Sequence, residues 1–196
     1  MVPTPTAPVQ QVEIDGAIVT TRSALDVVPE QASVVRFSST LIDDGGGFEL
    51  CLAGVMESLP PQCDGPVVVG LEPQGWTETQ SGVTWGDREV VVAWPPDDGE
   101  LVLIEDGPPR PPPDEPIDEA DGSYGQAALM AIQDQLSDAN LYGASGPVLS
   151  SGIGATPGRL DVGVAVADLA TVRRILEIVD TPDALHFWGH GEILAG

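Results

Sequence analysis

The sequence predicts a β-rich N-terminal domain followed by a small α+β C-terminal domain, and three features support this division. Short runs of β-branched and aromatic residues alternate with turn sequences over residues 33–106. A helical spacing of apolar residues begins after residue 122. The segment between them, residues 107–122, reads GPPRPPPDEPIDEADG, and this proline-rich acidic composition is typical of an extended, self-repelling linker.

The first 32 residues are expected to be a flexible tether followed by a poorly defined segment. The start, MVPTPTAPVQQ, resembles the stretch that follows an export signal or a lipid anchor. VEIDGAIV has the composition of a short strand, but residues 20–33 show no clear period.

Five strands are predicted within residues 33–106. A DDGGG turn at Asp43–Gly47 separates the first two, a proline-containing turn precedes the third, and PPDDG joins the last two as a hairpin. The five runs are SVVRFSSTL, FELCLAGV, PVVVGL, SGVTWGDREVVVAW and ELVLIED. We expect a small antiparallel barrel or sandwich, with an OB-like barrel as one candidate.

The region 123–196 is predicted to be α+β. Ser123 and Gln126 form the pattern of a capping box, and Leu129, Ile132 and Leu136 then share one helical face. Two strands follow, and Asp168 is placed to cap a second helix that ends near Val179. A final strand, ALHFWGHGEIL, completes most of a ferredoxin-like, split βαβ arrangement.

The charge of the chain limits its partners. It carries 31 acidic residues against seven basic ones, for a formal net charge of -24, and every basic residue is arginine. Such a field repels phosphate backbones and anionic lipid and attracts cations or basic protein surfaces, so nucleic acid is not expected to bind. Solubility is the simplest reason for the charge. No segment approaches the ~20 apolar residues of a membrane span.

Cys51 and Cys63 are the only cysteines, on either side of a proline-containing turn. We predict that they form one disulfide, with two buried free thiols as the alternative; their spacing does not fit a CxxC redox or zinc motif. A disulfide implies an oxidising compartment. The chain starts without the basic and apolar regions of a signal peptide, so we expect a mature form whose leader, and any lipid anchor, is not part of this sequence.

The segments ELCLAGVMESLPPQCDGP and SGVTWGD resemble a group of uncharacterised exported proteins, secreted or lipoprotein-type, from actinobacteria. The likeness covers most of residues 33–194 and is most specific around the cysteines. It implies export and a disulfide between Cys51 and Cys63. It carries no known activity and no catalytic residue.

The only two histidines lie in LHFWGHGE, where strand alternation places His186, Trp188, His190 and Glu192 on one face. Two imidazoles and a carboxylate can hold zinc or copper, which makes His186, His190 and Glu192 the candidate metal ligands. The alternative is a pair of histidines on a solvated or interfacial sheet face. No other cofactor is predicted.

Two further hypotheses concern the aromatic residues and the end of the chain. Trp76, Trp85, Trp94 and Trp188 form a candidate binding face, against ordinary core and hairpin packing. His190 and Gly191 resemble the His-Gly of caspase-like cysteine peptidases, but no cysteine follows them, so only a fragment of such a domain is compatible.

Taken together, these features favour an exported, non-enzymatic binding module at the cell surface. Its partner would be a protein or small ligand. A metal-binding protein or metal-dependent hydrolase is the first alternative, and the peptidase fragment is the second.

Overall fold

The computed structural model describes residues 7–73, 75, 77–95, 99–109, 122–142, 146–153 and 157–196. The chain divides into two compact units. We call Met1–Ala32 with Glu115–Gly196 the terminal unit, and Ser33–Asp114 the barrel unit. No helix in the described ranges is long and apolar enough to cross a membrane.

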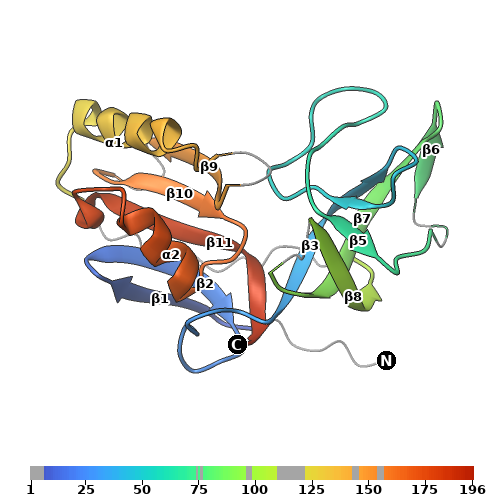
Figure 1. Cartoon of the computed structure of the whole chain (residues 1–196), viewed down its shortest axis with the longest axis horizontal. Coiled ribbons are helices and arrows are strands. Elements are labelled where there is room, and N and C mark those ends of the chain that lie inside the picture. The colour runs from blue at the N-terminus through green and yellow to red at the C-terminus, as the bar shows by residue number, and fades with distance from the viewer. Residues whose placement is uncertain are drawn as a thin grey trace. The chain divides into compact units, whose positions relative to one another are not determined.

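The terminal unit contains a mixed sheet in the order β1-β2-β11-β10-β9. The pairs β1–β2 and β10–β9 are antiparallel, whereas β11 runs parallel to both β2 and β10. Figure 1 shows β2 (blue) beside β11 (red). The strands are β1 (Val9–Ile14), β2 (Ala17–Ser23), β9 (Val148–Ile153), β10 (Leu160–Val164) and β11 (Leu185–Ala195).

Two helices, α1 (Gln126–Asp138) and α2 (Leu169–Leu176), pack on one face of this sheet, and a short 3-10 helix, η1 (Pro182–Ala184), precedes β11. The face is apolar because every second residue of each strand points to it. In-register neighbours carry one apolar row across four strands, formed by Val12, Val19, Phe187 and Val162. The helices add Leu129, Ile132, Leu136, Val172 and Ile175 to the same buried cluster. The helical face predicted for Leu129, Ile132 and Leu136 is thereby confirmed.

Of the two predicted helix caps, the one at Asp168 is confirmed and the one at Ser123 is wrong. Asp168 caps α2 as expected, since its carboxylate accepts the N–H of Thr171 at 2.9 Å. Ser123 does not cap α1; the helix begins at Gln126, and Gly125 occupies the N-cap position without a side-chain hydrogen bond.

The segment 1–32 was expected to be a tether, one short strand in VEIDGAIV and a poorly defined stretch, whereas its described part contains a paired hairpin of β1 and β2. Asp15 and Gly16 make its turn with φ of 51° and 93°, the left-handed backbone that two-residue hairpin loops require. Ala17 and Val19 are fully buried. The strand partner of this hairpin, β11, lies near the other end of the sequence, so a local reading of the pattern could not find it.

The ferredoxin-like, split βαβ arrangement is also not found. In a split unit another strand separates the two parallel strands, whereas β10 and β11 here pair directly, with Val162 opposite Phe187. Both strands are almost wholly apolar on the helix side, and pairing side by side buries that surface under the two helices.

The barrel unit contains a closed five-stranded barrel. The pairings β3–β4, β4–β5, β5–β8, β8–β7 and β7–β3 complete the circle. Its strands are β3 (Val34–Asp43), β4 (Glu49–Leu50), β5 (Val67–Val69), β7 (Val83–Ala93) and β8 (Glu100–Gly107). The short β6 (Glu78–Gln80) pairs with the first residues of β7, Val83 to Trp85. The barrel is mixed and not antiparallel as predicted, because β5 and β8 run parallel.

The barrel interior is filled by apolar side chains that are at most 2% exposed: Val35, Phe37, Leu41, Leu50, Val90, Val92 and Leu101. They occupy alternate strand positions, so the intervening residues of β3 and β7 point outward. The predicted turn after β3 is confirmed, since Asp43 accepts the N–H groups of Gly45 and Gly47 at 2.8 and 3.0 Å. Of the predicted 107–122 linker, Gly107 closes β8, and residues 110–121 lie outside the described ranges.

Candidate functional site

His186 is the centre of a buried polar network in the terminal unit. Its Nδ1 lies 2.8 Å from Oδ1 of Asp161, and its Nε2 lies 2.9 Å from the hydroxyl of Thr20. The strand register explains the contacts, because Asp161 pairs directly with His186 across β10 and β11. A carboxylate only accepts hydrogen bonds, so Nδ1–H donates to Asp161. In the neutral ring Nε2 accepts the Thr20 hydroxyl.

This order of hydroxyl, imidazole and carboxylate is that of a nucleophilic triad. The three residues are, however, only 5%, 5% and 7% exposed for Thr20, His186 and Asp161. A nucleophile needs room for its substrate, and these groups are buried. We therefore interpret the network as a structural one that satisfies polar groups within a buried sheet.

Trp188 and His190 continue along the same strand. Their rings lie 4.1 Å apart between centroids, and burial lowers the pKa of His190 below its ordinary value. Gly163, opposite Trp188 on β10, makes room for the indole: a Cβ there would lie 3.0 Å from Cζ2 of Trp188. The predicted alternation holds at the start of β11, where Leu185 and Phe187 are fully buried on the helix side.

The three candidate metal ligands do not come together. Both ring nitrogens of His186 are engaged with Asp161 and Thr20. His190 contacts Trp188, and Glu192 accepts the backbone N–H of Ala7 at 2.7 Å. The register shifts between Trp188 and Glu192, which interrupts the simple alternation used to place them on one face. In the described ranges no group of three or more His, Cys, Asp or Glu could hold a metal ion.

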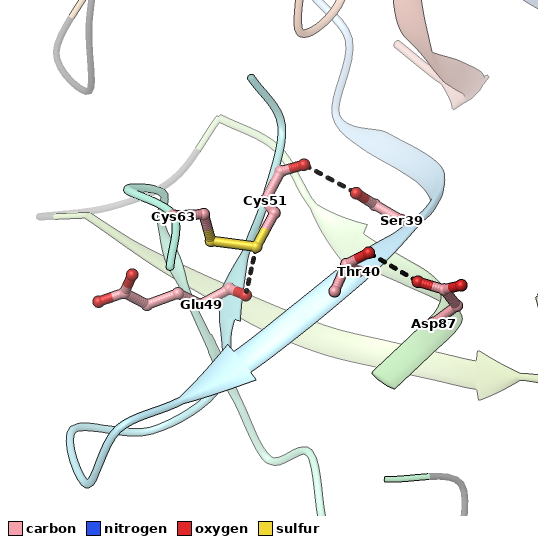
Figure 2. The surroundings of a disulfide bond; sticks show 6 residues. All are labelled: Ser39, Thr40, Glu49, Cys51, Cys63 and Asp87. Atoms are coloured by element: carbon pink, nitrogen blue, oxygen red, sulfur yellow. Dashed lines mark hydrogen bonds between the residues drawn. A yellow bond between two sulfur atoms is a disulfide. The ribbon is translucent and has the colours of Figure 1, made fainter. Parts of the chain in front are cut away.

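The barrel unit carries a second polar cluster, on its outer face. Asp87 pairs with Thr40 across β7 and β3, and Trp85 pairs with Glu78 across β7 and β6. Residues directly opposite each other in antiparallel strands share a face, as do residues two apart in one strand, so the four side chains lie together. The Thr40 hydroxyl donates to Oδ1 of Asp87 at 2.6 Å, as Figure 2 shows.

The predicted disulfide between Cys51 and Cys63 is confirmed, and it closes a loop beside this cluster. Figure 2 shows how the loop is attached to β3: the Ser39 hydroxyl donates to the carbonyl of Cys51 at 2.8 Å. The N–H of Cys51 also donates to the carbonyl of Thr40 at 3.0 Å. Within the loop, the N–H of Met56 donates to the carbonyl of Gln62 at 2.9 Å. We call residues 51–63 the disulfide loop.

The outer face of the barrel and the disulfide loop line an open pocket of about 590 Å³, which we call the barrel pocket. This volume is within the ~300–1,000 Å³ range of small-ligand sites. Pro61 is buried, whereas Val55, Glu78, Asp87 and Pro109 are exposed. The lining residues are Thr40, Val55, Pro61, Glu78, Trp85, Gly86, Asp87 and Pro109.

The tryptophans that the structure describes have different surroundings. Trp85 lines the barrel pocket, but Trp94 packs against Phe37 with ring centroids 5.7 Å apart. Trp188 belongs to the terminal unit, where it contacts His190. Trp76 lies outside the described residues.

Sequence reasoning missed most of both sites. The role of Asp161 could have been predicted, because it is the only charged residue within the apolar strand LDVGV. A charged group in a buried strand needs a hydrogen-bonding or charged partner. The roles of Thr20, Thr40 and Asp87 could not, because they depend on which strands pair. No protein-family model, no curated protein and no solved structure matches this chain.

Proposed function

We propose that this protein is an exported, non-enzymatic binding module, whose barrel pocket takes a small ligand or a short protein segment at the cell surface. The observation that carries the proposal is the barrel pocket itself. It combines an indole ring, apolar walls and a few carboxylate and hydroxyl groups, which is the usual composition of a binding site.

We further infer that the barrel is of OB type. Numbered within the barrel, its strands pair in the closed order 1-2-3-5-4, with the third and fifth parallel. An OB barrel is a five-stranded Greek-key barrel used repeatedly for ligand binding. The net charge of -24 argues against the nucleic acids that many such barrels bind.

Export is supported by the disulfide and by the resemblance of the cysteine segment to exported actinobacterial proteins. A disulfide is stable in an oxidising compartment and rare in the cytosol. The metal-dependent alternative loses support from the separate partners of His186, His190 and Glu192. Zinc or copper at a stoichiometric level in protein purified without a histidine tag would restore it.

The test is a fragment screen on ¹⁵N-labelled protein, with neutral, cationic and anionic compounds, read from the tryptophan indole N–H signals. We expect ligands to shift the Trp85 signal. Trp85→Phe lacks that signal, so it is followed through the backbone N–H signals of β6 and β7, and it should abolish binding. The matched control is Trp188→Phe in the terminal unit, which should leave binding unchanged. Shifts confined to Trp188 and the histidines, or no shifts at all, would overturn the proposal.

A further inference from the structure

We infer that the ligand of the barrel pocket carries a guanidinium group, as in the arginine side chain of a peptide. The inference rests on the proposed function and assigns the chemistry of the same pocket. Three features of the lining support it: two carboxylates, an indole ring beside them, and apolar walls around them.

The carboxylates are those of Asp87, on the same strand as Trp85, and Glu78, on the neighbouring strand β6. Glu78 lies directly opposite Trp85, and Asp87 lies two residues along the same strand. The Thr40 hydroxyl holds Oδ1 of Asp87 at 2.6 Å and so fixes the orientation of this exposed carboxylate. We assign its second oxygen, Oδ2, to the ligand. Among the residues that the structure describes, none in the pocket lining carries a positive charge that could compete for these groups.

The indole of Trp85 explains why the cation should be a guanidinium. A guanidinium is planar and weakly hydrated, so it stacks on an aromatic face while its N–H groups reach carboxylates at its edge. An ammonium is a strongly hydrated point charge that uses only one of these contacts well. Val55 and Pro61 of the disulfide loop, with Pro109, offer apolar contact to the aliphatic stem of the ligand.

The charge of the pocket favours a cationic ligand over anionic and neutral ones. Anions are disfavoured by the two carboxylates and by the net charge of -24, which also attracts cations over a long range at low salt. A neutral sugar could stack on Trp85 and donate hydrogen bonds to both carboxylates, but it would gain no charge attraction from them. Sugar binding is therefore an outcome of the test.

The experiment compares N-acetylarginine amide with N-acetylcitrulline amide, its neutral isostere, and with maltotriose, by titration against the Trp85 indole signal. We expect the arginine compound to bind about tenfold more tightly than the citrulline compound, as a charge-assisted contact of ~1.4 kcal/mol implies. Its affinity should fall as salt rises from about 20 to about 300 mM, because the Debye length shortens.

Two variants assign the effect to the pocket. Asp87→Asn and Glu78→Gln should each weaken the arginine compound severalfold and leave the citrulline compound unchanged. Glu105→Gln is the matched control, since this exposed glutamate lies on β8 outside the pocket lining and its change alters net charge equally. Glu78 is exposed in a short edge strand, so Glu78→Gln is expected to fold even if Asp87→Asn does not.

The possible results distinguish failure of the guanidinium assignment from failure of the proposed binding function. Equal binding of the arginine and citrulline compounds, or preference for maltotriose, would overturn the guanidinium assignment and leave the barrel pocket as a binding site. An equal loss in Glu105→Gln would reduce the effect to general charge attraction and overturn it too. Absence of any shift at Trp85 with every compound, fragments included, would overturn both proposals.

Discussion

The imidazole of His186 and the carboxylate of Asp161 lie 2.8 Å apart as direct partners on adjacent parallel strands, with both side chains no more than 10% exposed. Removing the carboxylate leaves a buried ring nitrogen without this acceptor. We expect Asp161→Ala to lower the free energy of unfolding by about 2–3 kcal/mol. Asp161→Asn keeps an acceptor oxygen and should cost less. Urea denaturation of both variants measures the difference, and equal losses would contradict the hydrogen-bond explanation.

Asp168 should be one of the most sensitive carboxylates of the terminal unit. Its two oxygens accept backbone N–H groups from Thr171 and from Ala32, each at 2.9 Å, so it caps α2 and holds residue 32 to it. Loss of a helix cap alone costs about 1–2 kcal/mol, and Asp168→Ala should reach the upper end of that range. Asp168→Asn is the control, because its amide oxygen can still accept one of the two bonds. Thermal unfolding with a helix-sensitive signal would check the order of stability.

The disulfide should stabilise the barrel and support the wall of its pocket. A loop of this length contributes about 3 kcal/mol through the entropy of the unfolded chain, so the double variant Cys51→Ala, Cys63→Ala should be less stable by roughly that amount. Val55 and Pro61 belong to this loop and line the pocket, so ligand-induced shifts at Trp85 should weaken as well. The native protein should show no free thiol after denaturation. A double variant with unchanged stability would contradict the prediction.

The stability of the protein should fall in mild acid, partly because of His190. Burial lowers the pKa of this imidazole below its ordinary 6.5 in the folded state. As the pH falls through 6.5, the unfolded chain binds a proton before the folded protein does, so unfolding becomes more favourable. The stability that the neutral His190 imidazole contributes is therefore fully present above pH 6.5. It is lost as the pH falls towards the folded-state pKa of His190.

His190→Gln isolates this effect, because the acidic residues are the same in the variant and in the parent. The urea midpoint of the variant should decline less than that of the parent between about pH 7.5 and pH 5.5, the interval around the ordinary histidine pKa. Parallel curves for the two proteins would show that His190 takes no part in the pH dependence.

Local patterns in the sequence predicted much of the secondary structure. The helical spacing of Leu129, Ile132 and Leu136, the cap at Asp168 and the hairpin of β7 and β8 are all found, because each depends on neighbours in the chain. The disulfide could be predicted because only two cysteines exist.

The rest depended on contacts between distant segments. Only one short strand was expected where β1 and β2 form a hairpin, because the partner strand β11 is at the other end of the sequence. The parallel pairing of β5 and β8 makes the barrel mixed, and no local pattern encodes it. The contact between Thr40 and Asp87 likewise follows only from the register of β3 and β7.

The pairing of β2 with β11 also sets an order of events for a newly made chain. All five strands of the barrel, and both cysteines, leave the ribosome before β11 does. The barrel can therefore close and oxidise early, while the hairpin of β1 and β2 waits with an apolar face uncovered. The interval between synthesis of residue 23 and residue 185 is the period in which this protein most needs protection from aggregation.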